Sequence, residues 1–187
     1  MSETTDDYLD SVTIGERAPH NAPVHLAPYD PAWPADYERL RAVIRDALGD
    51  RALELEHVGS TSVPGLTAKP VIDLVMTVAD STDEASYVPA LERCGFTLRI
   101  REPEWHEHRL LKGPGRKANL HVFSVGCGEL RRMVSFRDRL RSHPADRRFY
   151  EETKRALAAR SWTHVQHYAD AKSAVVEEIL SRAAGAG

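Results

Sequence analysis

The hydrophobic and polar residues of this chain follow two different periods, and the change between them predicts its organisation. From Asp30 to Leu48 apolar side chains recur every three or four residues, which predicts a helix that ends before Gly49. Ser81 and Glu84 form a capping-box pattern, which predicts a second helix. Shorter apolar stretches have the length and composition of strands, at residues 53–58, 71–78, 96–100, 108–112 and 119–125.

From residue 129 to about residue 183 the period is helical again, and three further helices are predicted there. The whole order predicts an α+β fold, in which a mixed sheet core with flanking helices is followed by a C-terminal helical segment. We expect one domain over residues 23–187, with the sheet core at about 23–127 and the helices at about 129–183. Residues 1–22 are polar and lack a periodic apolar pattern, so we expect a flexible tail there.

The composition is typical of a soluble globular protein, with 42% hydrophobic and 28% charged residues in a chain of 187. No apolar run approaches the roughly 20 residues that span a bilayer. The acidic start of the chain has no hydrophobic segment of the kind found in secretory signals. We therefore expect a cytoplasmic protein with no membrane partner. Two cysteines, Cys94 and Cys127, are too few for a disulfide framework and form no C-x-x-C pair.

The net charge of −3 is unevenly distributed along the chain. Residues 1–22 carry five acidic side chains and one arginine, whereas residues 99–155 carry 15 Lys or Arg against 8 Asp or Glu. This asymmetry suits an anionic ligand near the second half of the chain. The alternative is a solvated helix face on which arginines pair with acids. A generic nucleic-acid partner requires a more basic domain, so we do not expect one.

The most informative segment is HVGSTSVPGLTAKPVIDL, which begins at His57. A strand ends here in Gly59, and glycine lets the chain turn tightly and approach a ligand closely. Free backbone N–H groups in such a turn bind phosphate oxygens. Asp73 interrupts the next apolar strand, where a carboxylate must be paired, hydrogen-bonded or bound to metal. The other candidate phosphate ligands of the segment are Ser60, Thr61, Ser62 and Lys69.

A strand, a Gly-Ser turn, a spacer and an aspartate on a second strand resemble the signature of the nucleotidyltransferase superfamily. The segment is more closely similar to the hallmark of the GrpB family (UPF0157), and LAPYDPAWPADYERL, NLHVF and FRDRLRSHPADRRFYEETKRALA match other stretches of that family. The resemblance covers about residues 22–183. It implies a bacterial protein that holds a nucleoside triphosphate at Gly59 and Ser60 and Mg²⁺ at Asp73. Some family members are fused to dephospho-CoA kinase, which implies a functional link to that enzyme.

The chain departs from the superfamily pattern at two positions. Active nucleotidyltransferases carry Asp-x-Asp on the second strand and another acidic residue on a later strand. Here Val75 lies two residues after Asp73, and the later strand offers His121. Two Mg²⁺ ions need several carboxylates, so other residues must complete the site or the chemistry has changed.

Further polar residues are candidates for completing the site. Asp73 with His106, His108 and His121 would suit Zn²⁺, Mn²⁺ or Fe²⁺. The alternative is that these are surface or hydrogen-bonded histidines. A neutral histidine also suits acid–base chemistry, so Asp73 and His121 are the catalytic candidates. The remaining cationic candidates for binding phosphate are Arg109, Arg137 and Lys172.

Three hypotheses follow for the function. In the first, the protein is an enzyme that transfers a nucleotidyl group, or performs related phosphate chemistry, on a small-molecule acceptor. In the second, it binds a nucleotide, a CoA-like molecule or another anion at a degenerate site without catalysis. In the third, it is a transition-metal enzyme that uses histidines and Asp73 in the same cleft.

Overall fold

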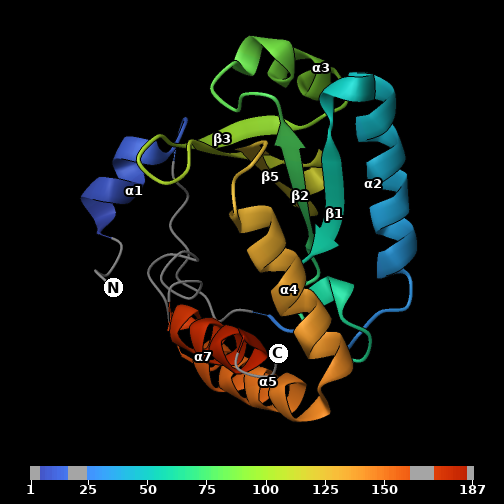
Figure 1. Ribbon diagram of the computed structural model, residues 1–187, viewed down its shortest axis with the longest axis vertical. Helices are drawn as coiled ribbons and strands as arrows, with labels where there is room; N and C mark the ends of the chain where they lie inside the picture. The colour runs from blue at the N-terminus through green and yellow to red at the C-terminus, as the bar shows by residue number, and fades with distance from the viewer. Residues whose placement is uncertain (1–4, 17–24, 161–170, 185–187) are drawn as a thin grey trace.

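The computed structural model describes residues 5–16, 25–160 and 171–184. Its centre is a five-stranded sheet with the order β1-β2-β5-β4-β3 (Figure 1). The strands are β1 (Glu54–Val58), β2 (Ile72–Val78), β3 (Thr97–Glu102), β4 (His108–Lys112) and β5 (Ala118–Ser124). β2 and β5 are parallel and the other neighbours are antiparallel, so the sheet is mixed and the predicted α+β class is confirmed.

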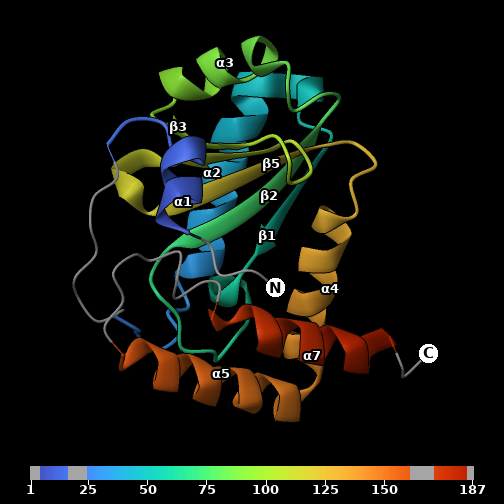
Figure 2. The same ribbon diagram turned by 90° about the vertical axis from the view of Figure 1, so that its left-hand side faces the viewer.

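Helices pack on both faces of this sheet. α2 (Trp33–Leu48) and α3 (Val88–Arg93) pack on one face, and α4 (Glu129–Ser142) crosses the other. α5 (Pro144–Ala158) and α7 (Ser173–Ala184) lie side by side at one end of the sheet (Figure 2). No helix in the described ranges has the length and apolar composition needed to cross a membrane.

The face toward α2 and α3 is apolar. Leu74, Met76 and Leu120 point into it and are completely buried together with Ile44 of α2 and Leu91 of α3. Side chains alternate between the two faces of a strand, so the neighbours of these leucines in sequence must face the other way.

The opposite face carries a group of polar side chains. Strand register sets Asp73 of β2 beside Asn119 of β5, and His121 follows two residues later on the same face. The register of β4 sets Lys112 beside Asn119, with His108 four residues earlier on that face. α4 covers part of this face with apolar residues. The sheet therefore separates an apolar core from a polar surface that α4, α5 and α7 border.

The amino-terminal region contains a helix that the hydrophobic pattern does not predict. α1 (Asp6–Val12) contacts β3, and its side chains Leu9 and Val12 are both buried. An antiparallel bridge between Thr13 and Ile100 continues the contact. The expectation of a flexible tail is therefore wrong for residues 6–12. Two buried apolar positions in seven residues are too few to establish a period, and tertiary contact with β3 stabilises this short helix.

The helix predicted from the capping-box pattern begins later than expected. A 3₁₀ turn at Glu84–Ser86 precedes α3, and Ser81 caps neither. The Ser81 side chain is completely buried, and its hydroxyl donates to the carbonyl of Glu107 at 2.8 Å. A long-range hydrogen bond to the turn before β4 thus replaces the local cap.

The connection from β1 to β2 begins with a sharp bend at Gly59. Its φ of 68° and ψ of −173° lie in a region that is essentially restricted to glycine. A Cβ atom on Gly59 would lie 2.4 Å from Oδ2 of Asp73. The main chain of the bend therefore packs directly against the carboxylate, and a 3₁₀ turn (Ser60–Ser62) follows it.

Replacing Gly59 with alanine should lower the free energy of unfolding by at least about 3 kcal/mol, through backbone strain and the clash with Asp73. Gly65 is a matched control, because its φ is 78° and no atom lies within 4 Å of its Cβ position. Gly65→Ala should cost only about 1–2 kcal/mol. Urea unfolding measures both, and the excess at Gly59 should shrink in an Asp73→Ala background. An excess that persists there in full would contradict the contact.

Candidate functional site

The carboxylate of Asp73 lies at the start of β2 and has different partners at its two oxygens. Oδ2 lies against the Gly59 bend, and Oδ1 accepts a hydrogen bond of 2.7 Å from Nδ2 of Asn119. Oδ1 of Asn119 in turn accepts from Nζ of Lys112 at 2.5 Å. A polar chain therefore crosses three adjacent strands and ends at the bend. The sequence-based expectation that the Asp73 carboxylate lies beside the Gly59 bend agrees with this geometry.

Lysine side chains gather around Asp73. Burial raises the pKa of Asp73, and the hydrogen bond from the Asn119 amide opposes that shift, as do the charges of Lys172, Lys112 and Lys69. Lys172 also acts on Lys154. Three lysines therefore act on Asp73, and Lys154 joins them through Lys172, so four of the five lysines in the chain belong to one electrostatically coupled group. This local excess of positive charge suits an anionic ligand.

Lys154 of α5 brings a buried amine to the bend. The residue is only 2% exposed, and its Nζ donates to Oγ of Ser60 at 3.0 Å and to the carbonyl of Thr67. Burial lowers the pKa of Lys154 to about 7, and the charge of Lys172 acts in the same direction. The amine therefore titrates near neutral pH, and an anion placed beside it would favour its charged form.

Tyr150 lies one helical turn before Lys154 and contacts the same serine. The Tyr150 side chain is buried, and Nζ of Lys154 lies 4.9 Å from the centroid of its ring. Burial raises the pKa of Tyr150 to about 12, and a hydrogen bond with Ser60 opposes the shift. The phenol therefore stays neutral and can donate a hydrogen bond. The hydroxyl of Ser60 therefore contacts two side chains of α5, Tyr150 and Lys154.

The hydroxyls of Thr61 and Ser62 have a different role from the one expected. Oγ1 of Thr61 lies 3.1 Å from Nε2 of His57 and donates to the carbonyl of Val71 at 3.2 Å. Oγ of Ser62 donates to the carbonyl of Gly59 at 2.6 Å. Both hydroxyls therefore hold the turn together, which corrects their assignment as phosphate ligands.

Backbone amides at the start of the turn remain available for a ligand. The amides of Ser62 and Val63 donate to the carbonyls of Gly59 and Ser60, at 3.3 and 3.2 Å. Within residues 5–16, 25–160 and 171–184, no acceptor receives a hydrogen bond from the amide of Ser60 or Thr61. Free N–H groups of this kind suit a phosphate oxygen.

Arg109 lies on the wrong face of the sheet for a phosphate ligand at this site. It pairs in register with Val122, which belongs to the apolar core on the α2 side. Its Nε donates to Glu84 at 2.6 Å, and its Nη1 donates to the carbonyl of Glu107 at 2.9 Å. The prediction for Arg109 is therefore wrong, because its odd position on β4 turns it away from Asp73.

Arg137 also lies elsewhere, beside the edge strand β1. Its Nη1 donates to Glu56 at 2.8 Å and to the carbonyl of His57 at 2.9 Å, and its Nε donates to Asp138. Arg139 on the same helix pairs with the buried Asp146. The alternative, in which α4 arginines pair with acids, therefore holds, and the assignment of Arg137 to phosphate at the bend is corrected.

A cavity of about 480 Å³ lies at this edge of β1. Arg137, Arg141, Tyr37 and His57 are among its lining residues, and Asp73 is not. The His57 ring stacks on Tyr37 at 4.7 Å, and burial lowers the pKa of His57 to about 4, with Arg141 and Arg137 acting in the same direction. The cavity therefore lies behind the turn, on a side separate from the Asp73 carboxylate.

The four residues predicted to bind a transition metal do not form a metal site. His106 has a φ of 56° in the turn before β4, so it is not on a strand face with His108. Both ring nitrogens of His108 are engaged, by Glu102 at 2.6 Å and by His121 at 3.0 Å. In the part of the chain that the structure describes, no three His, Cys, Asp or Glu side chains are grouped to hold a metal ion.

Sequence reasoning missed three residues of this site. Asn119 and Lys112 depend on strand register, which the hydrophobic pattern does not reveal. Lys154 leaves a readable signal, because it lies four residues after Tyr150 and three before Leu157, both buried. A lysine on the apolar face of an amphipathic helix is unusual, and it identifies a buried cation.

Comparison with known proteins gives the family. The model of the GrpB protein family matches residues 23–182. A UPF0157 protein of Halalkalibacterium halodurans is 57% identical, over 96% of this chain and 92% of that protein. A dephospho-CoA kinase of Mycolicibacterium paratuberculosis is 30% identical over 87% of this chain, but the match covers only 46% of that protein.

A solved structure agrees with these matches. The crystal structure of the conserved protein GrpB from Enterococcus faecalis has a TM-score of 0.73 and 28% identity, and covers 85% of this chain and 96% of that one. On this evidence, the chain belongs to the GrpB family.

Proposed function

We propose that the Gly59 bend, Asp73 and the surrounding lysines bind the phosphates of a nucleotide, and that the protein transfers a nucleotidyl group to a small-molecule acceptor. The observation that carries this proposal is the buried amine of Lys154, which donates to Ser60 at the bend facing Asp73. The order of strand, Gly-Ser turn and aspartate on the next strand supports the nucleotidyltransferase-like assignment.

Electrostatics favours a phosphate over a neutral ligand. A buried amine is costly unless an opposite charge compensates it. The acid whose charge acts on Lys154 is Glu151, and that carboxylate already accepts hydrogen bonds from Thr67 and Arg155. A phosphate group at the bend would supply the missing negative charge and would accept from the Ser60 amide.

Mg²⁺ fits this site as a companion of the phosphates. Asp73 alone lacks the ligands for two ions, since no group of three acidic or histidine side chains suits a metal in the described residues. Mg²⁺ commonly binds through one or two carboxylates together with substrate phosphates. Asp73 would hold one such ion, which supplies positive charge to the phosphates.

A specific observation favours a second function, binding without transfer. Val75 takes the place of a second aspartate, and it is completely buried in a cluster with Val58, Phe123 and Leu130 of α4. A carboxylate at position 75 would be buried in apolar surroundings, so Asp73 is the one carboxylate that β2 offers to this site. The partial match to a dephospho-CoA kinase makes nucleotides related to coenzyme A the first ligands to test under either function.

Nucleoside triphosphates should raise the melting temperature of the protein, and Mg²⁺ should increase the shift. A thermal-shift panel of ATP, GTP, CTP, UTP and dephospho-CoA, with and without MgCl₂, measures this. We expect Ser60→Ala and Lys154→Met to reduce the shift at least tenfold in apparent affinity, which corresponds to about 1.4 kcal/mol. Asp73→Asn should remove only the part that depends on Mg²⁺.

Lys117→Met is the matched control, because Lys117 is the one lysine outside the group and is exposed. That variant should keep the full ligand shift. Identical melting curves with every nucleotide, with and without metal, would contradict nucleotide binding. Release of pyrophosphate in the presence of an acceptor would distinguish transfer from binding alone.

Phosphate binding should take up a proton at pH 8. Lys154 has a pKa of about 7, so at pH 8 most of its amine is neutral in the free protein, and a bound phosphate raises that pKa. The terminal phosphate is already ionised at this pH. Affinity should therefore be highest below pH 7 and should fall as the pH rises above it.

Isothermal titration calorimetry in two buffers of different ionisation enthalpy measures the proton uptake, which should approach one proton per site at pH 8 and decline toward pH 6. Lys154→Met should show none at either pH. Uptake that is equal in the wild type and in this variant would assign the proton to another group.

A further inference from the structure

We propose that Glu102, His108 and His121 form a hydrogen-bonded proton relay that makes His121 the general base for the acceptor. This inference rests on the proposed nucleotidyl transfer for the identity of the reaction, and it adds the group that accepts the acceptor's proton. It arises from three side chains on neighbouring strands β3, β4 and β5.

The relay is continuous from a carboxylate to the ring that shares a sheet face with Asp73. Oε2 of Glu102 lies 2.6 Å from Nδ1 of His108, and Nε2 of His108 lies 3.0 Å from Nδ1 of His121. His121 is two residues after Asn119 on β5, on the same face of the sheet as Asp73. The charge of Lys112 acts on both Asp73 and His121, which places the relay beside the lysine group.

Hydrogen-bond directions determine where the protons lie. An ionised Glu102 only accepts, so Nδ1 of His108 carries a proton. In the proposed relay His108 is neutral, so its Nε2 accepts and Nδ1 of His121 donates to it. Nε2 of His121 is left with a lone pair, and within the described residues it has no hydrogen-bond partner. Burial is the largest cause that lowers the pKa of His121 well below its usual range, so the ring is neutral at physiological pH.

The surrounding structure fixes the relay in place. His108 is 3% exposed; its ring stacks on Phe123 at 4.8 Å, and the Trp105 ring meets it edge-on at 5.0 Å. Tyr8 of α1 donates to Oε1 of Glu102 at 2.9 Å, so the helix absent from the sequence prediction supports the carboxylate. Buried groups held by several contacts are oriented rather than free to rotate.

The turn before β4 is strained at its two central residues. His106 and Glu107 have φ values of 56° and 51°, a conformation that costs non-glycine residues about 1–2 kcal/mol each. The turn closes with the amide of His108 donating to the carbonyl of Trp105 at 3.1 Å. It thereby places the Trp105 ring on His108.

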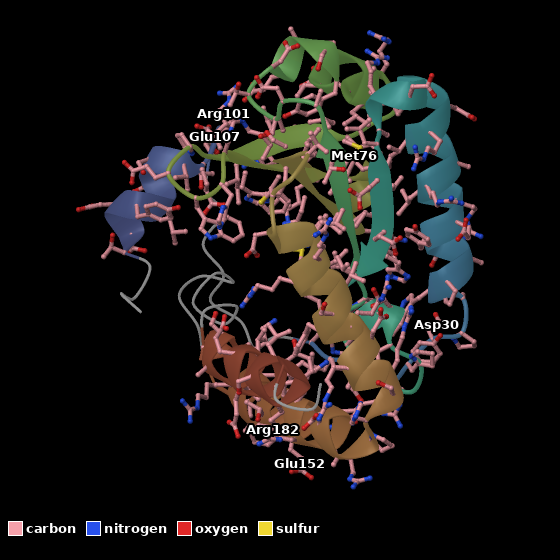
Figure 3. All side chains as sticks on the ribbon, viewed as in Figure 1. Asp30, Met76, Arg101, Glu107, Glu152 and Arg182 are labelled. Atoms are coloured by element: carbon pink, nitrogen blue, oxygen red, sulfur yellow. The ribbon has the colours of Figure 1, made fainter. Side chains whose placement is uncertain are left out.

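Arg101 and Glu107 lie at this end of the sheet beside α1, whereas Glu152 and Arg182 lie at the end that carries α5 and α7 (Figure 3).

The proton transfer balances without any further reactant than the nucleotide and the acceptor. The acceptor hydroxyl oxygen forms a bond to the α-phosphorus, and the bond from that phosphorus to the bridging oxygen breaks, so pyrophosphate leaves with the electron pair. The hydroxyl proton passes to Nε2 of His121. The proton on Nδ1 of His121 can then shift to Nε2 of His108, where the carboxylate of Glu102 stabilises the resulting cation.

NMR of the full chain labelled with ¹⁵N-histidine tests the relay directly and needs no substrate. Imidazole nitrogen shifts and their couplings to ring protons distinguish the two tautomers. We expect both His108 and His121 to carry their proton on Nδ1. The His108→Gln and His121→Gln variants assign these signals among the nine histidines. A proton on Nε2 of His121 in the wild type would overturn the proposal.

Variants then test the role of the carboxylate. Glu102→Ala should remove the preference for the Nδ1 tautomer in both rings. Tyr8→Phe is the matched control, because it deletes one hydrogen bond to Glu102 and keeps the contact with His108. Unchanged tautomers in a folded Glu102→Ala variant would also contradict the relay, and a backbone ¹H–¹⁵N spectrum shows whether that variant is folded.

Kinetics separates the relay from the proposed function. Once an acceptor is known, His121→Gln should lower kcat about 100-fold with an unchanged dissociation constant for the nucleotide, and Glu102→Ala should give a smaller loss of kcat alone. Equal losses in nucleotide affinity would indicate a structural role and overturn the base assignment. If the tautomers are as expected and no nucleotide binds, the nucleotidyl-transfer function fails while the proton relay itself stands.

Discussion

The contact between the main chain of Gly59 and the carboxylate of Asp73 joins the fold to its site. With a Cβ position only 2.4 Å from Oδ2, no other residue fits at the bend while β2 keeps its place. The contact fixes the start of β2 against the end of β1, and it fixes the direction in which Ser60 and its amide emerge. Because Asp73 also accepts from Asn119 on β5, the same carboxylate ties three strands together. A polar group at this position is therefore a structural requirement as well as a chemical one.

The ionisable groups around that carboxylate lie in surroundings that disfavour their charged forms. Lys154 is held at 2% exposure with its pKa lowered to about 7, and Asp73 is held where burial raises its pKa. Both shifts have the same cause, because each ionisable group is buried where water solvates its charged form poorly. Such strain is typical of functional sites, where a ligand rather than the fold supplies the compensating charge. The arginines of α4 differ from Lys154 in this respect, because carboxylates of the protein itself compensate their charge.

Local chemistry made part of this structure predictable. The Gly59 turn, Asp73 and the long helices follow from residue types and periods that act over a few positions, and the α+β class follows from their order. The prediction for Arg109 was wrong because the face of a strand side chain depends on its register with the neighbouring strands, and a shift of one residue in that register reverses the face. The prediction of a flexible tail was wrong for residues 6–12 because tertiary contact with β3, rather than helix propensity, stabilises that short helix. Asn119 depends on which strands meet in space, and a single sequence contains no signal for that. Lys154 could have been identified, because it lies on the apolar face of an amphipathic helix between Tyr150 and Leu157.

The two polar chains of the sheet depend on one strand. β5 carries Asn119 and His121 at alternate positions, so one points along the sheet to Asp73 and the other to His108. Leu120 between them lies in the apolar core on the other face. A slip of one residue in β5 would bury both polar side chains in that core and expose Leu120. The apolar packing under α2 and α3 therefore fixes the register, and through it the positions of a carboxylate network and of two hydrogen-bonded histidines on the opposite face. In this fold the hydrophobic face determines the chemistry of the polar one.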